Sequence, residues 1–274
     1  MGSDLSLTVG EQDAFTEDRA DYLAHLVAPL DDMWASFAED AKPFTLRLGG
    51  EVAGSGCVDD EGRLLRFFVR DPALHASRAL LQLAVERLEV GALLVFTQDP
   101  RALGVALELA RGVEVHSLVF AHLRPPAVEA LERTVVATEE HLESAIAFHE
   151  AATGAPREFL EGYDRERIQR GELVLSLEDE RILCAGELRR DASQPGVAQL
   201  GVVVAPEARG RGIASRMLTL LAARARAEGD TPVCSTEADN VAARKAIERA
   251  GFRALHRLLE IDVGFLRRCL SARA

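Results

Sequence analysis

Short apolar runs alternate with amphipathic stretches through the C-terminal half of the chain. Residues 199–204 form an apolar run that predicts a strand, and from Ile213 the apolar positions recur at helical spacing. A second strand ends at Glu237, and a second helix with one apolar face ends at Gly251. This half therefore predicts the order strand, loop, helix, strand, helix.

The N-terminal half repeats this order. LLRFFVRDPALHASRALLQLAVERL predicts a strand and a helix, and ALLVFTQDPRALGVALELARGVEV predicts a second such pair. Thr97 lies 15 residues before Gly112, and Thr236 lies 15 residues before Gly251. The same order with the same ungapped spacing indicates that the chain is an internal duplication.

Two further patterns complete each copy. LVLSLEDERILCAGELRR, at 173–190, predicts a hairpin that turns at Glu178-Asp179, and FTLRLGGEVAGSGCV predicts its partner with a turn at Gly49-Gly50. Helical spacing in Leu142, Ile146 and Phe148 predicts a helix, DRERIQRG predicts a second short one, and 150–165 is expected to form a loop. Strands alternating with helices indicate an α/β fold with a mixed sheet, two such domains in tandem.

A domain boundary is expected near residue 127. Pro125 and Pro126 follow the apolar run SLVFAHL and exclude a regular element at that point. We therefore expect one domain at 1–127 and a second at 128–274.

Charge and composition narrow the class of protein. The net charge of −12 argues against nucleic acid as a general partner. No apolar run approaches the roughly 20 residues of a membrane helix, and the N-terminus lacks the pattern of a signal peptide. The four cysteines, Cys57, Cys184, Cys234 and Cys269, form no closely spaced pair, so we expect buried thiols in a reduced, cytoplasmic protein without a metal site.

The segment PEARGRGIASRM, at 206–217, joins the strand at 199–204 to the next helix. Gly210 and Gly212 allow a close approach of the backbone to a ligand, because no Cβ stands in the way. The N-terminus of the following helix exposes unpaired N–H groups and carries positive partial charge. Together with Arg209 and Arg211, these features predict an anion site suited to phosphate. The plain alternative is a solvated basic turn.

The pattern Arg-x-x-Gly-x-Ala at 209–214, embedded in this order of elements with Asn240 and Gly251-Phe252 downstream, resembles the GNAT family of acyl-CoA-dependent N-acetyltransferases. The likeness covers 131–265 well and 5–123 in outline, and residues 198–252 also resemble the FR47-like branch. It implies acetyl-CoA as co-substrate and a small-molecule amine as acceptor. A homodimer is implied by family habit.

The resemblance also implies which residues bind coenzyme A. Its pyrophosphate would lie on a loop that binds mainly through backbone N–H groups: Arg209, Gly210, Arg211, Gly212, Ile213, Ala214 and Ser215. Its pantetheine arm would pair with a strand that splays from its neighbour, and would meet the start of the last helix: Val202, Val203, Val204 and Asn240. The first copy has RDPALHASRA in place of this loop, with no glycine, so we expect a degenerate domain that does not bind the co-substrate.

The acid and base of acetyl transfer are not at the family's usual positions. A tyrosine four residues before the glycine of the Gly-Phe pair is replaced by Ile247, and the usual glutamate position falls near Ala198 or Gln199. The substitutes considered are Glu187 and Glu237 as bases and Ser235 as a proton donor. The alternative for each of these three residues is a structural or solvent-exposed side chain without a catalytic role. Packing or surface roles are expected for His141, His149, Tyr163 and Cys234.

Two classes of function follow from this sequence. The first is an acetyl-CoA-dependent N-acetyltransferase that acts on a small amine or an amino-acid-like molecule by direct attack in a ternary complex. The second is a non-catalytic acyl-CoA-binding sensor or scaffold, which the missing acid and base favour. A third reading, an enzyme that acetylates basic proteins, rests on the acidic charge of the chain alone.

Overall fold

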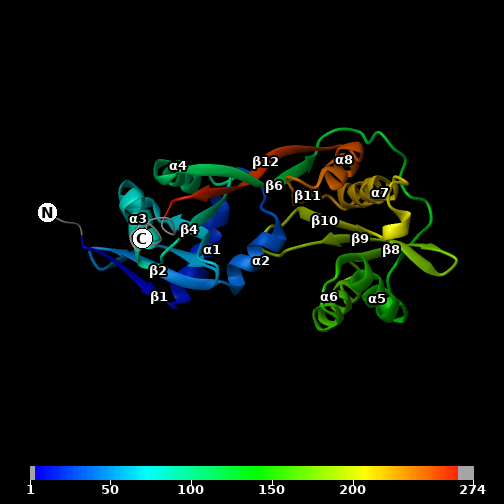
Figure 1. Ribbon diagram of the computed structural model, residues 1–274, viewed down its shortest axis with the longest axis horizontal. Helices are drawn as coiled ribbons and strands as arrows, with labels where there is room; N and C mark the ends of the chain where they lie inside the picture. The colour runs from blue at the N-terminus through cyan, green and yellow to red at the C-terminus, as the bar shows by residue number, and fades with distance from the viewer. Residues whose placement is uncertain (1–3, 265–274) are drawn as a thin grey trace, which may run out of the picture. The chain divides into compact units, whose positions relative to one another are not determined.

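A computed structural model describes residues 4–264 (Figure 1). The chain divides into two compact units. Unit 1 contains the chain up to Leu118 together with the segment that begins at His256. Unit 2 contains Val119–Leu255.

Unit 1 is built on a mixed sheet in the order β1-β2-β3-β4-β5-β12. Strands β1 to β4 pair antiparallel, β4 pairs parallel with β5, and β5 pairs antiparallel with β12. Helices α1 and α2 pack on β3, and α4 packs on β5 and α3. Its elements are β1 (Leu5–Val9), α1 (Asp13–Ala24), α2 (Asp32–Asp40), β2 (Lys42–Leu48), β3 (Glu51–Val58), β4 (Arg63–Val69), a 3₁₀ helix (Asp71–Ala76), α3 (Ser77–Arg87), β5 (Ala92–Phe96) and α4 (Pro100–Leu109).

Unit 2 repeats this plan with the order β6-β11-β10-β9-β8-β7. Strands β7 to β10 pair antiparallel and β10 pairs parallel with β11. Helices α5 and α6 cover one face of its sheet, and α7 and α8 lie on the other (Figure 1). Its elements are β7 (Thr134–Val136), a 3₁₀ turn (Glu139–His141), α5 (Leu142–Thr153), α6 (Arg157–Gln169), β8 (Leu173–Glu178), β9 (Arg181–Arg189), β10 (Val197–Val204), a 3₁₀ turn (Pro206–Ala208), α7 (Ile213–Ala227), β11 (Thr231–Glu237) and α8 (Val241–Arg249).

Two long strands, β6 (Gly112–His122) and β12 (Phe252–Asp262), belong to both units. β6 passes from unit 1 to unit 2 after Leu118, and β12 passes from unit 2 to unit 1 after Leu255. Each unit is therefore completed by a strand from the other half of the sequence. The domain boundary near residue 127 stays a prediction. The structure shows in addition that the two halves of the sequence exchange a strand.

The exchange predicts that unit 1 depends on a residue near the C-terminus. Ile261 is fully buried in the unit 1 core and lies opposite Leu93 of β5. We expect Ile261→Ala to lower the free energy of unfolding by about 2–4 kcal/mol, because it leaves a cavity in that core. Leu255→Ala, at a β12 position that is 52% exposed, should change it by less than about 0.5 kcal/mol. Urea unfolding followed through Trp34, which lies in α2, measures both variants, and equal small effects would contradict the placement of β12.

Most predicted elements are confirmed. Both hairpins form: Gly49 and Gly50 turn the first, and positive φ angles at Asp179 and Glu180 turn the second. The loop expected at 150–165 is wrong, because α6 begins at Arg157 directly after Pro156. Leu160 and Ile168 of this helix are buried against the sheet, a periodicity hidden in the sequence by charged residues between them.

Within the described residues, no helix is both long and apolar enough to cross a membrane. Over the same range, no group of three or more His, Cys, Asp or Glu side chains is placed to hold a metal ion. The cytoplasmic location and the homodimer stay predictions.

Candidate active site

The sheet of unit 2 opens between its two parallel strands. β10 pairs with β11 only over Val197–Gln199, opposite Thr231–Val233, while its antiparallel pairing with β9 continues to Val204. The strand is thus held on one side and parts from its neighbour on the other. The half-buried segment Val202–Val204, expected to meet the pantetheine arm, lies in this diverging part.

The loop after β10 ends in two glycines with left-handed backbone. Gly210 has φ +78° and Gly212 has φ +74°, a conformation that side chains with a Cβ rarely adopt. An added Cβ at Gly210 would have no atom within 4 Å, so the loop lies open. α7 begins directly after Gly212 without a side-chain cap on its first N–H groups. This geometry provides unpaired backbone donors and the positive end of the helix dipole to an anion.

The two arginines of the loop have different roles. Arg209 reaches back from the loop, where its Nη2 donates to the carbonyl of Ala152 at 3.3 Å and its Nε donates to that of Val204 at 3.4 Å. Arg211 forms an exposed ion pair with Glu178 at 3.5 Å. Arg209 therefore ties the loop to the end of α5 and to β10, which leaves the backbone N–H groups as the main donors that the loop offers.

The residues at the family's usual acid and base positions are buried side chains, and the expectation that they do not serve as acid or base stays a prediction. Ile247 is buried in α8, and Ala198 and Gln199 are buried in β10. Asn240 caps α8: its Oδ1 accepts a hydrogen bond from the N–H of Ala243 at 3.0 Å. A contact between Asn240 and pantetheine stays a prediction.

A charged cluster lies on the sheet face that α5 and α6 cover. Glu187 stands opposite Gly201 in the β9–β10 register, and a Cβ added at Gly201 would lie 3.4 Å from Glu187 Oε2. The hydroxyl of Tyr163 donates to the same Oε2 at 2.7 Å. Arg189 Nη1 also donates to Oε2, and lies 3.4 Å from the Tyr163 hydroxyl. The absent side chain at Gly201 thus makes room for this cluster beside the diverging strand.

The surroundings of Tyr163 keep its hydroxyl protonated. Burial raises the pKa of Tyr163 well above its usual value, and the negative charge of Glu187 raises it further. Its ring stacks with the ring of Phe159 at 5.5 Å, and the guanidinium of Arg167 lies 5.4 Å from its centroid. The phenol is therefore a fixed hydrogen-bond donor on the covered face of the sheet.

Ser235 and Glu237 lie on the same face of the sheet as Glu187. In the parallel register Gln199 matches Val233, and side chains alternate along β11, so positions 235 and 237 share the face of 233. Ser235 is half-buried and Glu237, the last residue of β11, is exposed. The structure brings Glu187 together with Tyr163 and Arg189, and leaves Glu237 at the end of its strand.

His149 and His141 each contact neighbouring residues of their own domain, which agrees with the packing roles expected for them. Nδ1 of the buried His149 in α5 lies 2.9 Å from the carboxylate of Asp164 in α6, and this pair joins the two helices. His141 forms a capping box with Thr138 at the 3₁₀ turn Glu139–His141, which precedes α5. Tyr163 falls within the segment 150–165, which was predicted to be a loop, and Arg189 was not a predicted site residue. Two sequence features could have indicated these residues. Glu187 and Arg189 are two positions apart and therefore share one face of a strand, and Tyr163 belongs to an amphipathic segment that could cover that face.

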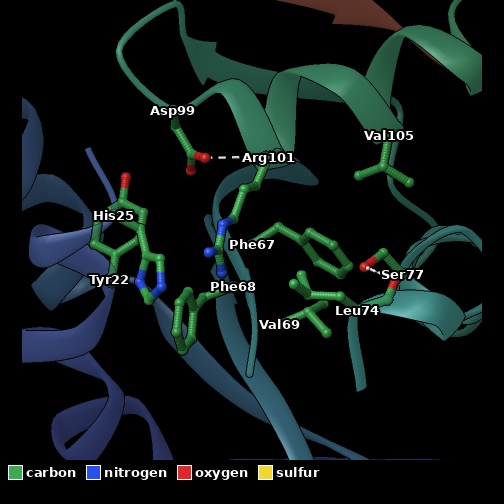
Figure 2. A pocket seen from close by; sticks show the side chains of 11 residues that line it. Tyr22, His25, Phe67, Phe68, Val69, Leu74, Ser77, Asp99, Arg101 and Val105 are labelled. Atoms are coloured by element: carbon green, nitrogen blue, oxygen red, sulfur yellow. Dashed lines mark hydrogen bonds between the residues drawn. The ribbon is translucent and has the colours of Figure 1, made fainter. Parts of the chain in front are cut away.

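The corresponding opening in unit 1 is filled by side chains. β4 pairs with β5 only over Arg63–Leu64, so these strands also diverge. Figure 2 shows aromatic side chains from α1 and β4, with Arg101 of α4, around the small pocket that remains there: Tyr22, Phe67 and Phe68. A 3₁₀ helix without glycine, Asp71–Ala76, stands where unit 2 has its glycine loop. The expectation that unit 1 does not bind acetyl-CoA stays a prediction, and these features support it.

The buried thiols should be chemically inert. Burial raises the pKa of Cys57 and of Cys184 to about 12, so at pH 8 only about one thiol in 10⁴ of each is ionised. We expect alkylation by iodoacetamide at pH 8 to be slow at both and to speed up about tenfold per pH unit. Mass spectrometry of peptides, with urea-unfolded protein as control, measures each cysteine separately. Cys234 is also buried, and Cys269 lies outside the described residues.

Each unit has four antiparallel strands, a parallel strand that diverges and helices on both faces, and unit 2 adds a glycine loop at a helix start. This arrangement defines an acyltransferase class of fold. Comparison with known families matches residues 11–123 to an acetyltransferase (GNAT) domain and residues 142–252 to the acetyltransferase (GNAT) family. The chain belongs to the GNAT acetyltransferase family, with two domains in tandem, as the sequence predicts.

Solved structures agree with this assignment. A GNAT-family acetyltransferase from Colwellia psychrerythraea is 32% identical, with a TM-score of 0.89 over 94% of this chain and 99% of that one. Two others share the fold: a tandem GNAT protein from the clavulanic acid biosynthesis pathway, and a GCN5-related N-acetyltransferase from Sphaerobacter thermophilus. The tandem protein is 17% identical, with a TM-score of 0.61 over 95% of this chain and 99% of that one. The Sphaerobacter protein is 16% identical, with a TM-score of 0.63 over 94% of this chain and 96% of that one. No curated protein sequence matches significantly.

Proposed function

We propose that unit 2 is an acetyl-CoA-dependent N-acetyltransferase that passes the acetyl group to the amine of a small molecule by direct attack in a ternary complex. The observation that carries this proposal is the open loop of Gly210 and Gly212 at the start of α7, next to a strand that diverges from its neighbour. A solvated basic turn would not require two left-handed glycines directly before an uncapped helix.

The residues present fit coenzyme A. The loop from Arg209 to Ser215 would hold the pyrophosphate through backbone donors, and Val202–Val204 with Asn240 would line the pantetheine arm. Bound acetyl-CoA would supply a thioester whose carbonyl carbon bonds to the amine nitrogen as the carbon–sulfur bond breaks, while the amine loses a proton and the departing coenzyme A thiolate gains one. An N–H group of β10 is suited to polarise that carbonyl.

Glu187 is the carboxylate best placed to hold the acceptor amine. It is mostly buried beside Gly201, and Tyr163 and Arg189 fix its position. Both contacts reach Oε2, and the other oxygen, Oε1, takes part in neither. Ser235 and Glu237, on the same face of β11, are the further candidates to move a proton, directly or through water.

Calorimetric titration with acetyl-CoA, followed by assays of coenzyme A release with amines, tests this function. One site per chain and amine-dependent release are expected. Two sites would mean that unit 1 also binds the co-substrate. Binding without transfer to any amine would favour the non-catalytic sensor, and absence of binding would reject both functions.

A further inference from the structure

The outer side of the Tyr163 ring carries an exposed aromatic residue. Phe159 lies one helical turn before Tyr163 on α6, and the two rings stack at 5.5 Å with an interplanar angle of 22°. Phe159 exposes 59% of its surface, so its ring is open to contact with a bound molecule. Because the Tyr163 hydroxyl donates to Glu187, contacts run from Phe159 through Tyr163 to the carboxylate, and these three residues define the candidate acceptor surface.

The positive charge of this surface is already engaged. Arg189 Nη1 contacts both Glu187 and Tyr163, and Arg167 Nη1 contacts Glu172 at 2.7 Å. An acceptor therefore meets oxygen atoms that accept hydrogen bonds and an apolar ring, while both guanidinium groups already hold carboxylates. The overall charge of −12 also favours a cation over an anion.

We propose that the acceptor is an amine with an aromatic or bulky apolar group and no carboxylate, whose amine is held by Glu187 and whose apolar group packs on Phe159. This inference rests on the proposed function and narrows its acceptor. Phe159 is the residue that selects the apolar group. Tyr163 is a positioning residue, because it acts through Glu187.

Three acceptors separate these features. 2-Phenylethylamine carries the ring, ethylamine lacks it, and phenylalanine adds a carboxylate to the same skeleton. We expect kcat/KM for 2-phenylethylamine to exceed each of the other two by about tenfold or more, since a good apolar contact discriminates by about 10–200-fold. Equal values, or a preference for phenylalanine, would overturn the inference.

Variants locate the effect. Phe159→Ala should raise KM for 2-phenylethylamine about tenfold with little change in kcat, and leave ethylamine kinetics unchanged. Tyr163→Phe retains the ring but removes the donor to Glu187, and should weaken both amines. Val241→Ala, at an apolar residue of α8 that is 48% exposed, is the matched control and should change neither. Equal losses for both amines in Phe159→Ala would contradict its selective role.

The same samples distinguish failure of this inference from failure of the proposed function. Titration with acetyl-CoA reports binding of the co-substrate to each variant, independently of any acceptor. Acetyl transfer without the expected ring preference would overturn only the inference. Binding of acetyl-CoA with no transfer to any of the three amines would also overturn the inference, and absence of binding would reject the proposed function itself.

Discussion

Gly212→Val should weaken acetyl-CoA binding by about 100-fold or more. Gly212 has φ +74°, which a β-branched residue adopts only under strain, and it directly precedes the first N–H groups of α7. A Val residue there must either distort the loop or place its side chain beside these donors. Calorimetric titration of the parent and the variant with acetyl-CoA measures the loss.

Gly229→Val is the matched control for this substitution. Gly229 follows α7, has φ +90°, and an added Cβ would have no atom within 4 Å. It therefore imposes a similar backbone strain away from the anion loop, and should lower thermal stability by a similar amount while leaving the dissociation constant within about twofold. If Gly212→Val binds acetyl-CoA as tightly as the parent, the loop is not the pyrophosphate site.

Glu187→Gln should lower kcat/KM for the amine acceptor by about 100-fold and leave the affinity for acetyl-CoA unchanged. The substitution keeps the shape of the side chain and an oxygen that accepts from Tyr163, but removes the negative charge that holds the amine and pairs with Arg189. Steady-state kinetics with 2-phenylethylamine, together with calorimetry, separates the two effects.

Glu248→Gln controls for the loss of a carboxylate as such. Glu248 lies 3.7 Å from Arg244 on the exposed side of α8, and a surface pair of this kind contributes less than about 1 kcal/mol to stability. Its kinetics should match those of the parent. An equal loss in both variants, or full activity of Glu187→Gln, would remove Glu187 from the reaction and leave Ser235 and Glu237 as the groups to test.

Much of unit 2 was readable from short-range patterns. The strand ending at Val204 and the helix beginning at Ile213 each depend on residues close together in sequence, so hydrophobic periodicity predicted them. The glycine loop was readable for the same reason, since left-handed backbone before a helix is a local property.

Local patterns failed where distant residues decide the structure. The segment 150–165 was predicted to be a loop because its apolar positions are sparse, whereas α6 begins at Arg157 because Leu160 and Ile168 pack on the sheet. The Glu187 cluster was only partly foreseen, because Tyr163 and Arg189 meet the carboxylate through the packing of α6 on β9.

The sequence by itself determined the duplicated order of strands and helices and the position of the glycine loop, because both are encoded by neighbouring residues. Only the tertiary structure decided that β6 and β12 each complete the sheet of the other half, and that Tyr163, stacked on Phe159, donates a hydrogen bond to Glu187. Strand pairing and side-chain clusters join residues far apart in sequence, and which partner is chosen depends on the buried surface of the whole fold.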